Sequence, residues 1–411
     1  MSDPSCRSCH APRLTPVLSL GSQPLANALL SADRLAEPEA RYPLDLAFCR
    51  GCTLVQITEV VPPEILFRDY VYFSSYSETM LAHARSLVAQ VLERERPASS
   101  ALVVEVASND GYLLQYYKER GLRVLGIEPA VNIARVAEER GIPTLPDFFG
   151  RDVAASLVAG GTTADVIHAH NVLAHVADTN GFVAGLSQLL AGPGTAVIEV
   201  PYVKDMIDRC EFDTIYHEHL CYFSLTALET LFGRHGLAVK DVQRVPIHGG
   251  SLRLFLGHAG AAPVLPSVAV LRSEEKAWGV GTVAFYEGFA RRVDALTTAL
   301  RQTLSRLKGD GLRLAAYGAA AKGATLLNSA GIDAATLDFV ADRSPHKQGR
   351  FMPGSRIPIV APEKLLEERP DVVLILAWNI ADEIVAQQDE YRRRGGRFLI
   401  PVPDVRFVEA S

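Results

Sequence analysis

The sequence predicts an α/β protein with three domains. Its 411 residues exceed what one hydrophobic core usually organises. Two C-x-x-C pairs lie in the first 52 residues, and two patterns of strand, tight turn and helix follow, one in the middle of the chain and one in its last third. We therefore expect a small metal-binding domain over residues 1–75 and two Rossmann-like α/β domains over residues 76–275 and 276–411.

The composition is that of an ordinary globular protein. Apolar residues make up 48% of the chain, and the formal net charge of -6 provides no basic field for nucleic acid or lipid. The N-terminus MSDPSCRSCHAPR has no apolar signal region, and no run approaches the roughly 18 apolar residues that span a bilayer. We expect a cytoplasmic monomer without nucleic-acid or membrane partners.

The cysteine spacing predicts a structural zinc site in the first domain. Cys6 and Cys9 form one C-x-x-C pair, and Cys49 and Cys52 form the other. In a reducing cytoplasm such pairs are typical of Zn²⁺ held by four thiolates, although unligated cysteines or a redox pair are the alternatives. The segments LTPVLSLG and RYPLDLAF between the pairs are expected to be strands. Four thiolates leave no open coordination position, so this zinc would stabilise the domain and do no chemistry.

The middle domain begins with a β-α-β pattern, ALVVEVASNDGYLLQYYKERGLRVLGIEPA. Its first strand leads into the turn 107–111, and its second strand ends at Glu128, where a carboxylate can accept hydrogen bonds from ribose hydroxyls. Nicotinamide enzymes require G-x-G-x-x-G at this turn, and only Gly111 is present, with Ala107 and Asn109 where glycines would stand. The acidic-x-G-x-G-x-G turn of S-adenosylmethionine (SAM) methyltransferases, opened here by Glu105, fits better.

Further residues agree with a Rossmann-like SAM methyltransferase domain. Asp147 and Phe148 follow the expected third strand, where an acidic residue lies near adenine. Asn171 lies in DVIHAHNVLAHVAD, which we interpret as a fourth strand and a loop over the cofactor, and GTAVIEVPYV is the expected fifth strand. On these residues alone, a doubly wound domain that binds another nucleotide-like ligand stays possible.

At this point the chain resembles a known family, the sugar C-methyltransferases of antibiotic deoxysugar pathways. The resemblance covers essentially all 411 residues and rests on the two C-x-x-C pairs, the turn N-D-G, the segment I-Y-x-E-H followed by H-G-G, and the C-terminal motifs YGAAAKG and DRSPHKQGRF. It implies methyl transfer from SAM to a ring carbon, usually C3, of a dTDP-linked 4-keto-deoxysugar. His217 departs from the family pattern, so we do not expect it to be essential.

The segment FDTIYHEHLCYF, residues 212–223, concentrates side chains that transfer protons. Methylation of carbon requires a base that removes a C–H proton beside the ketone, and donors aimed at the enolate oxygen. We expect His219 to be the base, with Glu218 orienting its ring or the neighbouring contacts. Tyr216 is the second candidate for the base and otherwise a donor to the enolate oxygen, and a turn must bring it to His219. A catalytic metal on His217 and His219 is disfavoured by their spacing.

Additional polar residues are candidates for the wall of the active site. His175 follows the fourth strand and His248 begins H-G-G, although a single loop histidine is more often structural. The segment YVYFSSYSE supplies three tyrosines, Tyr70, Tyr72 and Tyr76. We expect one of them to reach the substrate. The alternative is that they form one face of a strand.

The last domain is expected to hold the nucleotide. A helix over about residues 283–307 leads into LRLAAYGAAAKGATLLNSAG, a strand, a turn and a helix. Ligands of doubly wound sheets bind beyond the carboxyl ends of the strands, where four candidate substrate-binding residues lie: Gly318, Lys322, Lys347 and Asn379. A dTDP diphosphate would use the helix N-terminus and a lysine, whereas an ordinary turn with solvated lysines is the alternative.

Three other functions stay open on the sequence. An O- or N-methyltransferase asks less of its base, because its acceptor already has a lone pair. A nicotinamide-dependent oxidoreductase is disfavoured by the glycine-poor turn. A noncatalytic nucleotide-sugar binding protein would not need Glu218 and His219.

Overall fold

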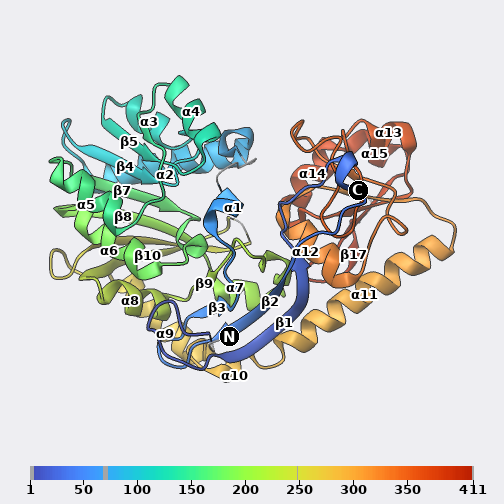
Figure 1. The fold of residues 1–411 in the computed structure, drawn as a ribbon, viewed down its shortest axis with the longest axis horizontal. Coiled ribbons are helices and arrows are strands. Elements are labelled where there is room, and N and C mark those ends of the chain that lie inside the picture. Colours follow the sequence, from blue (N-terminus) through green and yellow to red (C-terminus); the bar gives the residue numbers. More distant parts are fainter. Residues whose placement is uncertain (1–3, 68–72, 248, 410–411) are drawn as a thin grey trace.

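The computed structural model describes residues 4–67, 73–247 and 249–409, and its strands form sheets of four, seven and six strands. Figure 1 shows the seven-stranded sheet on one side of the molecule and the six-stranded sheet on the other. The long strands β1 (Thr15–Pro24) and β2 (Arg41–Phe48) run from one toward the other. The mixed α/β class and the two Rossmann-like sheets are thus confirmed, whereas the exact domain boundaries at residues 75 and 275 stay predictions.

The four-stranded sheet joins the first domain to the segment that carries the candidate base. Its order is β1-β2-β3-β9, all antiparallel, with β3 at Val55–Ile57 and β9 at Cys221–Tyr222. Both strands expected between the cysteine pairs are present. Because β9 follows His219 by two residues, the zinc-binding domain supports the segment directly. The first domain also contains two short helices, η1 (Ala32–Arg34) and α1 (Pro63–Phe67).

The seven-stranded sheet has the order β10-β11-β8-β7-β4-β5-β6. Its strands are β4 (Leu102–Val106), β5 (Arg123–Ile127), β6 (Thr144–Leu145), β7 (Ala164–His170), β8 (Leu190–Pro201), β10 (Leu237–Val245) and β11 (Ser251–His258). All are parallel except β11, which runs against both neighbours. The chain leaves β4 toward β5 and returns to the other side at β7. The carboxyl ends of these two strands form the switch point at which doubly wound sheets bind ligands.

The helices around this sheet and at its edge follow in chain order: η2 (Ser74–Tyr76), α2 (Glu78–Glu95), α3 (Leu114–Lys118), α4 (Val131–Glu139), α5 (Arg151–Ala159), η3 (Leu173–His175), α6 (Thr179–Leu189), α7 (Val203–Asp208), η4 (Phe212–Thr214), α8 (Leu225–Gly233) and α9 (Pro266–Trp278). The structure corrects one prediction between the two large sheets, because the single helix expected over residues 283–307 is divided into α10 (Val283–Tyr286) and α11 (Phe289–Gly309). Gly288 adopts a left-handed conformation with φ 84°, which is incompatible with a continuous right-handed helix.

The six-stranded sheet is also doubly wound, with the order β14-β13-β12-β15-β16-β17 and only β17 antiparallel. Its strands are β12 (Leu314–Tyr317), β13 (Val340–Ala341), β14 (Ile359–Val360), β15 (Val372–Ile375), β16 (Arg397–Ile400) and β17 (Arg406–Phe407). Its helices are α12 (Ala321–Ala330), α13 (Lys364–Glu368), η5 (Trp378–Ile380), α14 (Ala381–Gln387) and α15 (Asp389–Arg393). The strand order reverses at β12, so a second ligand edge lies beyond β12 and β15.

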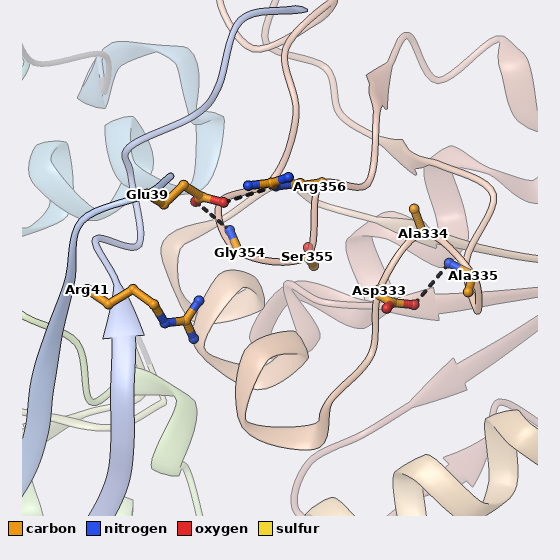
Figure 2. Close-up of a pocket in the computed structure, with 8 residues that line it drawn as sticks. All are labelled: Glu39, Arg41, Asp333, Ala334, Ala335, Gly354, Ser355 and Arg356. Carbon is orange, nitrogen blue, oxygen red and sulfur yellow. Dashed lines mark hydrogen bonds and ion pairs between the residues drawn. The ribbon is translucent and has the colours of Figure 1, made fainter. Parts of the chain in front are cut away.

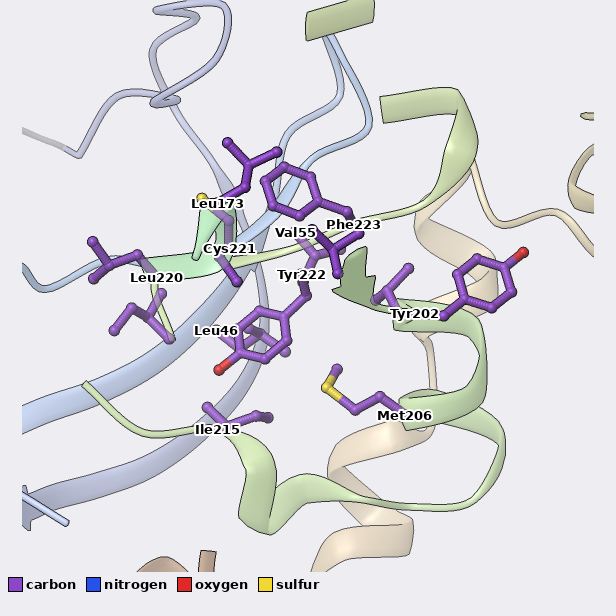
Figure 3. Packing of buried hydrophobic residues seen from close by; sticks show 14 of the residues in the cluster. Leu46, Val55, Leu173, Tyr202, Met206, Ile215, Leu220, Cys221, Tyr222 and Phe223 are labelled. Atoms are coloured by element: carbon purple, nitrogen blue, oxygen red, sulfur yellow. The ribbon is translucent and has the colours of Figure 1, made fainter. Parts of the chain in front are cut away.

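One continuous cluster of buried apolar side chains extends through all three sheets. Figure 3 shows its centre, where Leu46 and Val55 of the first domain lie beside Ile215, Leu220 and Tyr222. These buried residues flank Tyr216 and His219, so packing holds the segment at both ends. Among the described residues, no helix is both long enough and apolar enough to cross a membrane.

Candidate active site

The four predicted cysteines come together in the first domain. Their sulfur atoms all lie within 4.8 Å of one another, and the Cys6–Cys52 and Cys9–Cys49 pairs are 3.4 and 3.5 Å apart. Tetrahedral zinc with Zn–S bonds of about 2.3 Å places its sulfurs about 3.8 Å apart, close to this arrangement. In each knuckle a backbone N–H donates to the carbonyl of the first cysteine, from His10 to Cys6 and from Thr53 to Cys49. The donor set therefore fits a closed structural zinc.

The turn after β4 has the backbone of a glycine-rich turn although two of its glycines are replaced. Ala107, Asn109 and Gly111 have φ values of 55°, 50° and 77°, all in the left-handed region. Asparagine tolerates this region, and alanine adopts it at a cost of about 1–2 kcal/mol. A Cβ on Gly111 would lie 2.9 Å from Ile142 Cγ1, so this glycine is required by space as well. The turn thus matches the methyltransferase template in conformation.

The predicted cofactor residues gather at the carboxyl edge of the seven-stranded sheet. The Glu128 carboxylate, at the end of β5, accepts the backbone N–H groups of Asn109 and Ala130, each at 2.9 Å. Glu105 is buried in β4, and burial raises its pKa well above the ordinary value. The other members follow β6 and β7: Asp147, Phe148 and Asn171. The edge therefore brings Glu105, the turn and Glu128 together.

Tyr216 and His219 form a hydrogen-bonded pair. The Tyr216 hydroxyl lies 2.8 Å from His219 Nε2, and His219 Nδ1 lies 2.8 Å from the Thr214 carbonyl oxygen. A carbonyl only accepts, so Nδ1 carries the hydrogen, and in the neutral ring Nε2 accepts from the tyrosine. A turn in which the His219 N–H donates to the Tyr216 carbonyl brings the two side chains together, as the sequence requires. The pair is partly exposed, which leaves it open to a substrate.

The other residues of the segment point in different directions. Glu218 is buried, and its Oε1 accepts from Asn27 Nδ2 at 2.7 Å, a residue of the first domain that sequence reasoning missed. His217 lies 3.2 Å from the Pro43 carbonyl, away from the pair, in agreement with a packing role. His175 meets the His219 ring edge-on at 4.7 Å, and burial lowers its pKa to about 4, so it stays neutral at physiological pH.

Four predicted residues of the last domain meet beyond β12 and β15. Lys322 Nζ donates to Asn379 Oδ1 at 2.7 Å, and Lys347 Nζ donates to the Ala319 carbonyl at 2.8 Å. Gly318 opens the turn with φ 93°, and a Cβ there would lie 3.0 Å from the Ala377 Cβ. Two lysines and a tight turn at the N-terminus of α12 thus share one edge.

This edge contacts the segment that carries the candidate base. Helix α12 packs on η4, and Trp378 Nε1 donates to Asp213 Oδ2 at 2.7 Å. Burial raises the pKa of Asp213 to about 6 and that of Glu211 to about 8, while the Lys322 ammonium opposes both shifts. Sequence reasoning missed these two carboxylates. The sequence feature that could have identified them is their position, since Glu211 directly precedes the segment 212–223 and Asp213 is its second residue.

The remaining candidates divide by position. Tyr76 is 59% exposed and lies with Phe73 and His346 in a group of three rings, with centroids 5.2 to 6.5 Å apart. Tyr70, Tyr72 and His248 lie outside the described residues. The two glycines after position 248 adopt positive φ values, 92° at Gly249 and 120° at Gly250, which other residues rarely adopt.

A pocket of about 500 Å³ lies apart from these residues, between the first domain and the six-stranded sheet (Figure 2). Its lining includes Glu39, which accepts the Gly354 N–H at 2.7 Å and lies 3.4 Å from Arg356 Nε. No residue predicted from the sequence lines it. The pocket lies where the first domain contacts the last domain.

Comparison with known proteins agrees with this architecture. Three family models match in order: "Putative zinc binding domain" over residues 6–67, "Methyltransferase domain" over residues 76–242 and "C-methyltransferase C-terminal domain" over residues 246–403. The C-methyltransferase NovU of Streptomyces niveus is 38% identical over 407 residues, which cover 99% of this chain and 97% of NovU. The chain belongs to the C-methyltransferase family. The resemblance found in the sequence is confirmed.

Two solved structures each match less than half of this chain. The magnesium protoporphyrin IX methyltransferase of Synechocystis is 13% identical with a TM-score of 0.35, and the match covers 46% of this chain and 86% of that protein. A putative methyltransferase solved with the Trm112 activator of Haloferax volcanii is 16% identical with a TM-score of 0.36, covering 44% and 92%. The family assignment establishes a SAM-dependent C-methyltransferase with SAM and structural zinc as its cofactors.

Proposed function

We propose that this C-methyltransferase acts on a dTDP-linked 4-keto-deoxysugar and methylates C3, the ring carbon beside the ketone. The observation that carries the proposal is the Tyr216–His219 pair, whose donor and acceptor geometry suits removal of a weakly acidic proton. Bound SAM supplies an electrophilic methyl group. A neutral sugar carbon does not attack it, so the chain has to generate an enolate first.

The pair provides a route for that proton. We assign the Tyr216 oxygen to meet the C–H group and His219 Nε2 to receive the hydroxyl proton as the C–H proton moves to oxygen. The imidazolium so formed keeps its Nδ1 donor on the Thr214 carbonyl. The electron pair of the broken C–H bond moves toward the ketone oxygen. The resulting enolate carbon would then bond to the methyl group of SAM, whose bond to sulfur breaks and leaves S-adenosylhomocysteine.

The lysine edge of the last domain supports a nucleotide diphosphate as part of the substrate. Lys322 lies in the first turn of α12, and Lys347 Nζ reaches the Ala319 carbonyl in the turn before this helix. Backbone N–H groups at a helix N-terminus and cationic side chains attract phosphate. Asn379 holds Lys322, and Gly318 gives the turn its shape. Tyr76, exposed in its three-ring group, offers a flat apolar face for the base or the sugar. We further propose that His175 and His248 complete the sugar-binding wall, and that one of Tyr70, Tyr72 and Tyr76 reaches the substrate.

The experiment is product analysis with defined labels. The enzyme is incubated with ¹³C-methyl SAM and a dTDP-4-keto-6-deoxyhexose labelled with ¹³C in its ring. One-bond carbon–carbon coupling between methyl and C3 is the expected result. A methyl group without such coupling would sit on oxygen or nitrogen and would contradict the proposal.

A monomeric cytoplasmic enzyme is also part of the proposal. The negative net charge argues against a nucleic-acid partner. Light scattering behind a sizing column tests the oligomeric state, with the mass of a single chain as the expected result.

A further inference from the structure

Trp378 and Asp213 connect the last domain to the candidate base. Trp378 lies in η5, directly beyond β15 of the six-stranded sheet, and its Nε1–H donates to Asp213 Oδ2 at 2.7 Å. The two residues are 165 positions apart in the chain. The Asp213 side chain is fully buried, and the indole N–H, together with the Lys322 charge and the backbone N–H groups of Asp213 and Thr214, offsets the cost of removing this carboxylate from water.

The neighbour of Asp213 determines how His219 is held. Thr214 follows Asp213 in η4, and its carbonyl accepts the Nδ1–H of His219 at 2.8 Å. The turn is closed by the Thr214 N–H and hydroxyl, which both donate to the Glu211 carbonyl, at 3.1 and 2.6 Å. A shift of η4 would therefore move the carbonyl that keeps the hydrogen on Nδ1.

The indole itself is held in place. Lys322 Nζ lies 4.5 Å from the centre of the Trp378 ring and also donates to Asn379, the next residue in η5. The lysine carries a charge opposite to that of Asp213, and α12, which carries Lys322, packs on η4. The residues beyond β12 and β15 thus hold η4 in place through the Trp378–Asp213 hydrogen bond, the Lys322–Trp378 cation–π contact and the opposite charges of Lys322 and Asp213.

We propose that Trp378 and Asp213 are positioning residues for the methyl-transfer reaction. They fix the Thr214 carbonyl and through it the Nδ1–H tautomer of His219, which leaves Nε2 free to accept from Tyr216. The last domain then takes part in catalysis by shaping the base, separately from any nucleotide that it binds. The role of His219 as base rests on the proposed function, whereas the tautomer is a property of the protein alone.

The test compares two tryptophan variants of the full-length enzyme. Trp378→Phe removes the N–H donor and keeps an aromatic ring beside Lys322. Trp278→Phe is the matched control, since it changes the other tryptophan of the chain, which packs against Lys204 in another region. ¹⁵N-histidine NMR reports the tautomer of His219, whose signals are identified by their loss in His219→Asn.

We expect the Nδ1–H tautomer in the wild type and in Trp278→Phe, and a mixture of tautomers in Trp378→Phe. Because small displacements of a catalytic group are costly, kcat with the keto sugar should fall roughly tenfold or more in Trp378→Phe at unchanged SAM affinity. Asp213→Asn, which keeps an oxygen for the indole, should retain the tautomer, and Asp213→Ala should lose it. This second pair decides the question if Trp378→Phe does not fold.

The proposal is overturned if Trp378→Phe or Asp213→Ala folds and keeps both the wild-type tautomer and the wild-type kcat. A rise in KM for the keto sugar alone, with an unchanged tautomer, would also overturn it, because the contact would then only dock the substrate. Failure of the proposed function has a different signature. The tautomer results would then hold, and no keto sugar would be methylated on carbon.

Discussion

Asn27 of the zinc-binding domain donates a hydrogen bond of 2.7 Å to the buried carboxylate of Glu218, 191 positions away. The first domain therefore reaches the proton-transferring segment with a side chain as well as with the strand pairing of β3 and β9. A metal-stabilised domain that does no chemistry itself can in this way determine the position of the candidate catalytic groups.

Removing this donor should reduce both stability and turnover. In Asn27→Ala the buried Glu218 oxygen loses its charge-assisted bond, at an expected cost of about 1–3 kcal/mol in the free energy of unfolding. Urea unfolding measures the loss. Asn27→Asp should have a lower free energy of unfolding than Asn27→Ala, because two carboxyl groups would then face each other. Wild-type stability and kcat in Asn27→Ala would show that the contact is incidental.

Tyr216→Phe should impair the chemical step and leave cofactor binding intact. The change removes the hydroxyl that His219 Nε2 accepts from, and general acid–base groups typically contribute about 10²–10⁴-fold. We expect kcat to fall by about 10² or more while the SAM dissociation constant, measured by calorimetry, stays the same. Tyr286→Phe is the control, since its hydroxyl donates to the Val280 carbonyl at 3.0 Å and it lies in the apolar core. Equal losses in both variants would contradict the assignment.

Substitutions at the two ends of the turn 107–111 should have different effects on stability and SAM affinity. Gly111→Ala adds a Cβ in the left-handed region and against Ile142, so stability and SAM affinity should both fall. Ala107→Gly removes the same kind of penalty and adds chain entropy to the unfolded state, so the net change should be small. Thermal melting and SAM titration check both variants. A tightly binding Gly111→Ala would refute the assigned conformation.

Loss of a zinc ligand should weaken activity through the sheet. Cys49→Ser removes one of four thiolates, and we expect lower bound zinc, a lower melting temperature and reduced turnover, because β3 pairs with β9 beside the segment. Cys210→Ser changes a buried cysteine outside the cluster and should keep the zinc. Zinc is counted by a chromogenic chelator after denaturation. Complete zinc loss with unchanged melting would argue against a structural role.

Glu211 should make stability depend on pH in a specific direction. Burial raises its pKa from 4.5 to about 8, so between these values the folded protein holds a proton that the unfolded chain has released. The contribution of this proton to stability is full below pH 4.5 and is lost as pH rises through 8, by at most about 1.4 kcal/mol per pH unit. Relative to Glu211→Gln, the wild type should therefore lose stability between pH 5 and pH 8. The free energies of unfolding of both proteins are measured with urea over this pH range. The same pH dependence in the wild type and in Glu211→Gln would contradict the raised pKa of Glu211.

Local patterns in the sequence predicted the parts of the fold that depend on local spacing. The two C-x-x-C pairs and the turn from Ala107 to Gly111 are short, and their geometry follows from adjacent residues. The convergence of Tyr216 and His219 was also predictable, because the chemistry required a turn between residues three positions apart. The long-helix prediction was wrong at Gly288, since apolar periodicity continues on both sides of a residue whose backbone reverses hand.

The contacts that sequence reasoning missed join distant parts of the chain. Asn27 reaches Glu218, and Trp378 reaches Asp213, only after three sheets have packed together. Nothing in the residues around Asn27 or Trp378 indicates such a partner. These pairs depend on the arrangement of the domains, which the local periodicity of the chain does not specify.

The measurement that tests the central claim most directly is hydrogen exchange at C3 without methyl transfer. The enzyme is incubated in deuterium oxide with the dTDP-4-keto sugar and S-adenosylhomocysteine, which occupies the cofactor site and carries no methyl group. The wild type should introduce deuterium at C3, and His219→Asn should not. Absence of exchange in a wild-type enzyme that nevertheless methylates the sugar would contradict an enolate formed by the Tyr216–His219 pair.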